Sequence, residues 1–328
     1  MGLRLLPATL PGPDERARAE VRARASRVLR PTGAFERLDE VAAWLGAWQG
    51  TSTPAVERPA AIVFVADHGV AAEGVSAYPQ QVTASMLAAL RERVATANVL
   101  ADEVGATLDV VDVGVGRPTG NIAVEPALDG ERFQTAFELG RASISALDAD
   151  LVVVGEMGIG NTTAAAAVSA SLFGLTAEDW TGRGTGIDPE RLATKVEVVR
   201  AACARAGECA PMEVLRQLGG AEMVAVAGAV LQARMDRRPV VLDGFVVTAA
   251  VAPLELARRG ALDHCIAGHL SPEPGHQLLL EKLGMEPLLD LGLRLGEATG
   301  ALAAVPLVRM AARAVVDVAT FDERGLER

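Results

Sequence analysis

Five short apolar runs divide the chain, and longer segments with a helical pattern lie between them. The runs are rich in alanine and β-branched residues, and they span 60–66, 108–113, 151–154, 240–242 and 265–267. Continuous apolar runs separated by helices are typical of a parallel sheet that is covered on both faces. The pattern therefore predicts an α/β fold.

The helical segments predict how the rest of the chain is organised. Between the strands they cover residues 81–102, 132–147, 161–173, 189–206, 220–235 and 245–258. Asp188 followed by Pro189 is a strong helix start, because Asp favours the N-cap and Pro the first helical position. Two amphipathic helices precede the first strand, at 13–29 and 38–48, and residues 274–320 are again helical. We expect a doubly wound, mostly parallel, Rossmann-like sheet over 60–270. Residues 1–59 and 271–328 would form a smaller helical domain.

Composition and charge narrow the class of protein. Aromatic residues make up only 3% of the 328 residues, so the core must be built from Ala, Val and Leu. The net charge is −11 and no basic stripe occurs, which argues against a nucleic-acid partner. The three cysteines (Cys203, Cys209 and Cys265) form no CxxC pair. No secretory signal or run of about 18 apolar residues is present. We expect a cytoplasmic protein without a membrane span.

The stretch GEMGIGNTTA, residues 155–164, is the most informative in the chain. It lies between a predicted strand and a predicted helix, where free N–H groups suit an anion. Its glycines, Asn161 and two threonines leave the backbone open and rich in donors. However, Glu156 would repel a phosphate beside it. The turn therefore suggests a nucleotide with a cationic ring or a polar sugar rather than a bare phosphate.

Residues 67–81 form a long loop after the first strand, where ligands of open parallel sheets bind. The loop holds Ser76, Gln81 and the only tyrosine, Tyr78. It could form a pocket for a flat aromatic ligand, or it could be a surface loop in which the backbone satisfies His68.

A second glycine-rich loop, TGRGTGID at 181–188, precedes the helix that carries Lys195. A lysine can meet a phosphate as a point charge while loop amides supply further donors. The alternative is a solvated helix face for Lys195. No GxxxxGK[ST] motif occurs, so the loop is not a P-loop.

The remaining polar junctions are weaker signals. Gly114 and Gly116 match half of a dinucleotide fingerprint, but Thr119 stands where the third glycine belongs, so a tight turn is the simpler interpretation. His264, His269 and His276 lack the spacing of a metal site. Glu222, at a helix start, could simply complement the helix dipole.

Two further carboxylates could belong to a ligand site. Asp243 ends a strand, which places it at the carboxyl edge of the sheet, where ligands bind. Glu297 has the small neighbours Gly296, Ala298 and Gly300. These neighbours would let a ligand approach closely, and partial burial would raise the pKa of Glu297 toward that of a useful base. The alternative for Glu297 is a carboxylate at a helix start.

Six motifs occur in order between about residues 60 and 301: VFVADHGVAAEGVSAYPQQVT, GEMGIGNTT, GRGTGID, LGGAEM, LDGF and LGLRLGEATGA. With them the chain resembles the nicotinate-nucleotide–dimethylbenzimidazole phosphoribosyltransferase family. The resemblance implies transfer of the phosphoribosyl group of nicotinate mononucleotide onto a nitrogen of 5,6-dimethylbenzimidazole. The products would be nicotinate and α-ribazole 5′-phosphate, with inversion at the anomeric carbon. It also implies a homodimer that needs no metal and no cofactor.

The resemblance assigns roles to individual residues. Glu297 would be the catalytic base, although Ala298 follows it where the family usually has glycine. Glu156 would stabilise ribosyl cation character in the transition state. Ser76, Tyr78 and Gln81 would line the dimethylbenzimidazole slot, and Asp243 is assigned to substrate binding. The phosphate would lie against Gly158, Gly160, Asn161, Thr162, Thr163, Arg183, Gly184, Thr185, Gly186 and Lys195.

Two other functions fit parts of the sequence. The α/β pattern with Gly114 and Gly116 would suit an NAD-dependent oxidoreductase, although the broken fingerprint argues against it. A non-catalytic protein that binds a nucleotide or a base would share the same loops.

Overall fold

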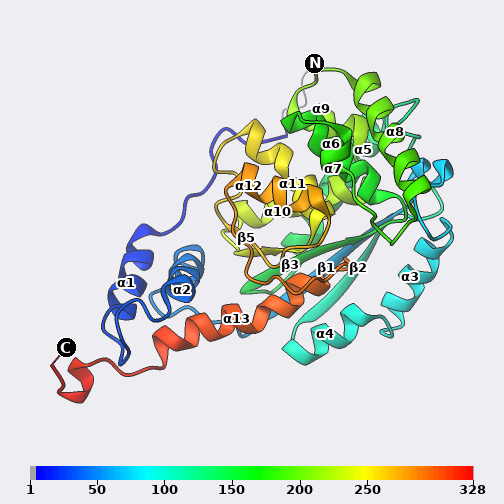
Figure 1. Cartoon of the computed structure of the whole chain (residues 1–328). Coiled ribbons are helices and arrows are strands. Elements are labelled where there is room, and N and C mark those ends of the chain that lie inside the picture. The colour runs from blue at the N-terminus through cyan, green and yellow to red at the C-terminus, as the bar shows by residue number, and fades with distance from the viewer. Residues whose placement is uncertain (1–4, 328) are drawn as a thin grey trace.

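The computed structural model describes residues 5–327, and a five-stranded parallel sheet forms its centre (Figure 1). The strand order is β2-β1-β3-β4-β5, and all four neighbouring pairs are parallel. The strands are β1 (Pro59–Ala66), β2 (Thr107–Gly114), β3 (Leu151–Met157), β4 (Val240–Leu242) and β5 (Cys265–Ala267). All five predicted strands are confirmed: β1, β3, β4 and β5 are almost entirely buried, as expected in a covered sheet, whereas the edge strand β2 is partly exposed.

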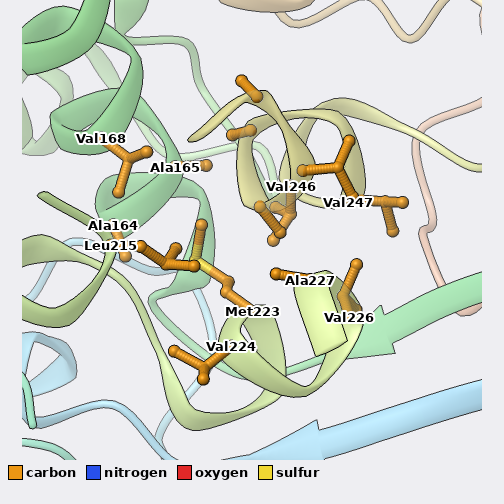
Figure 2. Close-up of a cluster of buried hydrophobic side chains, with 14 of the residues drawn as sticks. Ala164, Ala165, Val168, Leu215, Met223, Val224, Val226, Ala227, Val246 and Val247 are labelled. Carbon is orange, nitrogen blue, oxygen red and sulfur yellow. The ribbon is translucent and has the colours of Figure 1, made fainter. Parts of the chain in front are cut away.

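One face of the sheet is covered by the helices in the upper part of Figure 1. They are α5 (Gly130–Ser145), α6 (Asn161–Phe173), α9 (Pro211–Leu218), α10 (Ala221–Met235), α11 (Phe245–Ala257) and α12 (Pro274–Leu283). Figure 2 shows their apolar side chains, such as Ala164, Met223 and Val247, meeting in one cluster. Helices α5 and α10 touch closely, since a Cβ at Gly140 would lie 1.9 Å from the Ala225 oxygen. The Ala-rich and Gly-rich composition thus allows tight helix packing.

The other face is covered by α13 (Thr299–Val316), α2 (Glu36–Gln49), α3 (Val82–Arg91) and α4 (Thr96–Val104). Helix α1 (Glu15–Ala25) packs on α2 and α13. Arg24 donates to the carbonyl oxygens of Val315, Val316 and Val318, so the two chain ends lie together. The small terminal domain stays a prediction, because α13 also covers the sheet. Helix α13 is long and apolar enough to cross a membrane, but more than half of it is buried in this core.

Two expected helices are wrong in their extent. The segment predicted as one helix over 81–102 is broken between α3 and α4, where Arg93 has a left-handed φ of +61°. Residues 284–298 are not helical and separate α12 from α13. The short α7 (Ala177–Trp180) and α9 were not expected. In contrast, α8 (Pro189–Ala206) begins as predicted, with the Asp188 side chain accepting from the Arg191 amide.

Candidate active site

A cavity of about 410 Å³ opens at the carboxyl ends of β3 and β4. Its walls come from the start of α6, the start of α11, and three loops at 184–185, 269–273 and 293–297. Of the residues assigned to the substrate site from the sequence, those lining it are Tyr78, Glu156, Gly158, Asn161, Thr162, Gly184, Thr185 and Glu297. Those outside its lining are Ser76, Gln81, Gly160, Thr163, Arg183, Gly186, Lys195 and Asp243.

Glu156 lies near the end of β3 and is 6% exposed. The Asn161 side-chain amide donates to its Oε2, which fixes the carboxylate at the start of α6. Burial raises the pKa of Glu156 well above its usual range, and the charges of Glu222, Asp243 and Glu297 raise that pKa further. The backbone oxygen of Glu156 accepts from the Glu297 amide at 3.1 Å. The two glutamates, far apart in the sequence, therefore meet in one cavity.

Glu297 lies in a turn with an unusual backbone. Gly296, Glu297 and Ala298 have φ of +82°, +59° and +66°, which is left-handed in all three. Each non-glycine residue in this region costs roughly 1–2 kcal/mol, and such strain persists where the surroundings fix it. One constraint is Gly155, since a Cβ there would lie 2.2 Å from the Ala298 nitrogen. Another is Asp243, whose Oδ1 accepts from the Ala301 amide at 2.9 Å.

The environment of Glu297 suits a base. The residue is 3% exposed, and its Oε2 has no hydrogen-bond partner among residues 5–327. Burial, followed by the charge of Asp243, raises the pKa of Glu297 to about 7. A carboxylate with this pKa can take a proton from a ligand near neutral pH.

Lys195 lies beneath the glycine loop and is fully buried, which excludes the solvated helix face. Its Nζ donates to Thr162 Oγ1 at 2.8 Å and to the Gly182 oxygen at 3.0 Å. Burial lowers the pKa of Lys195 to about 8, while the charge of Glu273 opposes that decrease. An ammonium group has three donors, so a third can serve a ligand beside these two bonds.

The two loops expected to bind substrate touch each other. The Ala77 amide donates to Thr185 Oγ1 at 3.0 Å, and the Ser76 hydroxyl lies 3.3 Å from the same oxygen. Tyr78 is 55% exposed at the rim of the cavity. Gln81 is exposed beside the start of α3. The Arg183 side chain turns back to donate to the Ile187 oxygen.

A buried pair of polar groups was not expected from the sequence. His68 Nε2 lies 2.6 Å from Glu222 Oε1, and both side chains are fully buried. A Cβ at Gly220 would lie 2.3 Å from the His68 ring, so the pair fills the space that this glycine leaves. The hypothesis that the backbone satisfies His68 is therefore wrong, and Glu222 does more than complement a helix dipole.

The three late histidines have separate surroundings. His269 lines the cavity, with its Nε2 3.4 Å from Asp243 Oδ1. His276 Nδ1 accepts from the Ser271 amide at 3.0 Å, and His264 Nε2 lies 3.0 Å from the Val230 oxygen. Sequence spacing could not separate these roles, because the roles depend on the neighbours of each ring.

The sequence and the structure of this chain are both similar to those of known phosphoribosyltransferases. A family model described as "Phosphoribosyltransferase" matches residues 10–326. A nicotinate-nucleotide–dimethylbenzimidazole phosphoribosyltransferase of Cereibacter sphaeroides is 45% identical over 327 residues, covering 99% of this chain and 96% of the relative. That of Brucella anthropi is 46% identical over 321 residues, covering 97% and 94%. The crystal structure of CobT from Thermus thermophilus matches with a TM-score of 0.91 and 43% identity, covering 95% of this chain and 99% of that one.

Proposed function

The chain belongs to the nicotinate-nucleotide–dimethylbenzimidazole phosphoribosyltransferase family, and from that premise we propose how its cavity performs the reaction. The enzyme transfers the 5-phosphoribosyl group of nicotinate mononucleotide to 5,6-dimethylbenzimidazole, giving α-ribazole 5′-phosphate and nicotinate. The observation that carries the proposal is the meeting of Glu156 and Glu297 in one buried cavity.

Glu297 acts as the general base. Nicotinate leaves from a cationic pyridinium and becomes neutral at its ring nitrogen, so its departure needs no general acid. The benzimidazole attacks the anomeric carbon through one nitrogen, and the N–H of its other nitrogen becomes acidic. Glu297 takes that proton, and its pKa of about 7 is close to the pH at which a base works best. One base suffices, unlike the carboxylate pair of most glycosidases.

Glu156 stabilises the sugar as positive charge develops at its anomeric carbon. Without substrate, burial and the neighbouring carboxylates raise the pKa of Glu156 and favour its protonated form. The hydrogen bond from Asn161 and a cationic ring placed beside the carboxylate oppose this effect, so substrate binding favours the ionised form. Because the carboxylate lies in a buried wall of the cavity, its attraction for that charge is stronger than it would be in water.

The phosphate binds against Thr162 in the first turn of α6 and against the loop 182–186. Lys195 supports this assignment, since its ammonium group is held under both segments by Thr162 and Gly182. The amides at the start of α6 add donors that favour an anion. Tyr78 lines the same cavity as Glu297, and we place the benzimidazole between these two residues.

A product assay tests the proposal. The purified chain is incubated with nicotinate mononucleotide, with and without dimethylbenzimidazole, and the products are identified by mass spectrometry. We expect nicotinate and α-ribazole 5′-phosphate only when the base is added. A protein that only binds would take up both substrates and yield no ribazole phosphate on prolonged incubation. A panel of other benzimidazoles, phenols and adenine then defines the preferred base.

The assembly and location also form part of the proposal. We place the enzyme in the cytoplasm as a homodimer, with both chain ends forming a smaller helical unit. The three cysteines, which are all free, suit a reducing compartment. Leu291 and Leu295, in the loop between α12 and α13, are 66% and 53% exposed, and a partner would cover such apolar side chains. Light scattering after gel filtration gives the mass, and a monomer at micromolar concentration would contradict the dimer.

A further inference from the structure

Glu273 places a carboxylate against the glycine loop that precedes α8. Its Oε1 accepts from the Gly184 amide at 2.8 Å. Its Oε2 is buried and has no hydrogen-bond partner among the described residues. A Cβ at Gly182 would lie 2.3 Å from this oxygen, so only glycine leaves room for the carboxylate. The contact is therefore specific to both the loop and the glutamate.

The groups around Glu273 are those that would bind an anion. Besides the contact with the Gly184 amide, the Glu273 charge favours the protonated form of Lys195. Lys195 donates to the Gly182 oxygen, so the ammonium group and the carboxylate hold the same loop from two sides. Carboxylates and phosphates both accept charge-assisted hydrogen bonds of this kind. The acidic side chain thus occupies a donor that a substrate phosphate would use.

We propose that Glu273 is a positioning residue of the phosphate subsite: it shapes the loop 182–186 and competes with the phosphate for the Gly184 amide. The inference rests on the proposed function, since it takes the ligand at this loop to be the substrate phosphate. Two effects of Glu273 then oppose each other. Its hydrogen bond preorganises the loop, which favours binding, and its negative charge repels the phosphate.

Two substitutions separate these effects. Glu273→Gln keeps an oxygen that can accept from Gly184 and removes the charge. The substitution also removes the charge that raises the pKa of Lys195, so the variants are compared at about pH 6.5, where Lys195 keeps its proton. There we expect Glu273→Gln to lower the KM for nicotinate mononucleotide by about fivefold, given the modest strength of a partly solvated charge interaction. Glu273→Ala removes both the charge and the hydrogen bond. We expect it to raise that KM about threefold or more above the wild-type value, because the loop is no longer held.

The experiment measures KM for each substrate, kcat, and the binding of inorganic phosphate by calorimetry. Support requires that the Gln and Ala variants move KM for the mononucleotide in opposite directions, with KM for dimethylbenzimidazole unaffected. The proposal is overturned if the two variants behave alike, or if both match the wild type. Glu281→Gln, an exposed carboxylate on α12, serves as the control.

If the proposed function is wrong, the results differ from those expected if only the role of Glu273 is wrong. In that case the wild type would give no ribazole phosphate, whereas the phosphate titrations would still compare the Gln and Ala variants. Opposite shifts in phosphate affinity would then support the role of Glu273 at an anion site, and equal affinities would overturn it. Thermal unfolding of both variants shows whether either has lost its fold.

Discussion

The carboxylate end of the site, where Glu297 lines the cavity, and its lysine end, where Lys195 lies beneath the loop 182–186 outside the lining, bury opposite charges. Burial shifts the pKa of both groups so as to favour their neutral forms. At the carboxylate end, burial raises the pKa of Glu297 to about 7. At the lysine end, burial lowers the pKa of Lys195 to about 8. The base must be ionised and the lysine protonated, so the cavity is best prepared between these two values. In the proposed mechanism, burial thus tunes the base Glu297 and the anion-binding Lys195 together.

The backbone differs between the two ends as well. At the carboxylate end, Glu297 and Ala298 adopt left-handed conformations that disfavour side chains. At the lysine end, the left-handed positions are Gly184 and Gly186, where this conformation costs little. Between these two ends, strain is thus confined to the turn that positions the base. This contrast agrees with a carboxylate that must be held in place and a loop that must admit a ligand.

Among the variants that test the difference between the carboxylate end and the lysine end, Glu297→Gln should have the largest effect. It removes the base and keeps nearly the same shape, so we expect kcat to fall by roughly 100-fold or more. The affinity for both substrates should change little, because the phosphate and sugar contacts lie elsewhere. Steady-state kinetics with product detection measure kcat, and calorimetry measures binding.

A matched control for this variant is Asp290→Asn, which removes an exposed carboxylate from the same loop. Its turnover should match that of the wild type. Near-normal turnover in Glu297→Gln itself would remove Glu297 from its assigned role.

Asp243→Asn tests whether the pKa of Glu297 can be changed without changing that of Lys195. Asparagine can still accept the Ala301 hydrogen bond, but it lacks the charge that raises the pKa of Glu297. With the charge gone, Glu297 stays ionised to lower pH. The acid limb of the kcat/KM profile should therefore move down by about one pH unit. The alkaline limb, which follows loss of the Lys195 proton near pH 8, should stay in place. An unmoved acid limb, or a shift of both limbs, would show that Asp243 does not tune the base.

Much of the architecture could be predicted because it follows from local pattern. Strands β1, β3, β4 and β5 contain continuous apolar runs, and the edge strand β2 has an apolar run broken by Asp109 and Asp112. Helix α8 starts at a strong capping signal at Asp188. The break at Arg93 was missed, because the apolar pattern continues across it while the backbone does not. The prediction of helix across 284–298 is wrong for a local reason, because Gly284, Pro287 and Gly292 disfavour a helix there.

Only part of the site could be predicted from the sequence. Glu156 and Glu297, which both line the cavity, were predicted as site residues because they stand among small residues in strong motifs. Lys195 was found as a candidate, but its burial depends on helices far apart in the sequence. His68, Glu222 and Glu273 were missed as interacting groups for a related reason. Their partners are chosen by tertiary contacts, and nothing in the adjacent sequence marks those contacts.

Ala298→Gly tests the strain at the carboxylate end and should have the smallest effect. Glycine relieves a left-handed conformation that costs an alanine roughly 1–2 kcal/mol. The substitution also removes a fully buried methyl group, which destabilises the fold by about 0.8 kcal/mol. It gives the unfolded chain more conformational freedom, which destabilises the fold by about another 0.4–1 kcal/mol. These terms nearly cancel, so the free energy of unfolding should change by less than about 1 kcal/mol. Urea denaturation measures it. A loss above about 2 kcal/mol would mean that the Ala298 methyl stabilises the turn more than its left-handed backbone strains it.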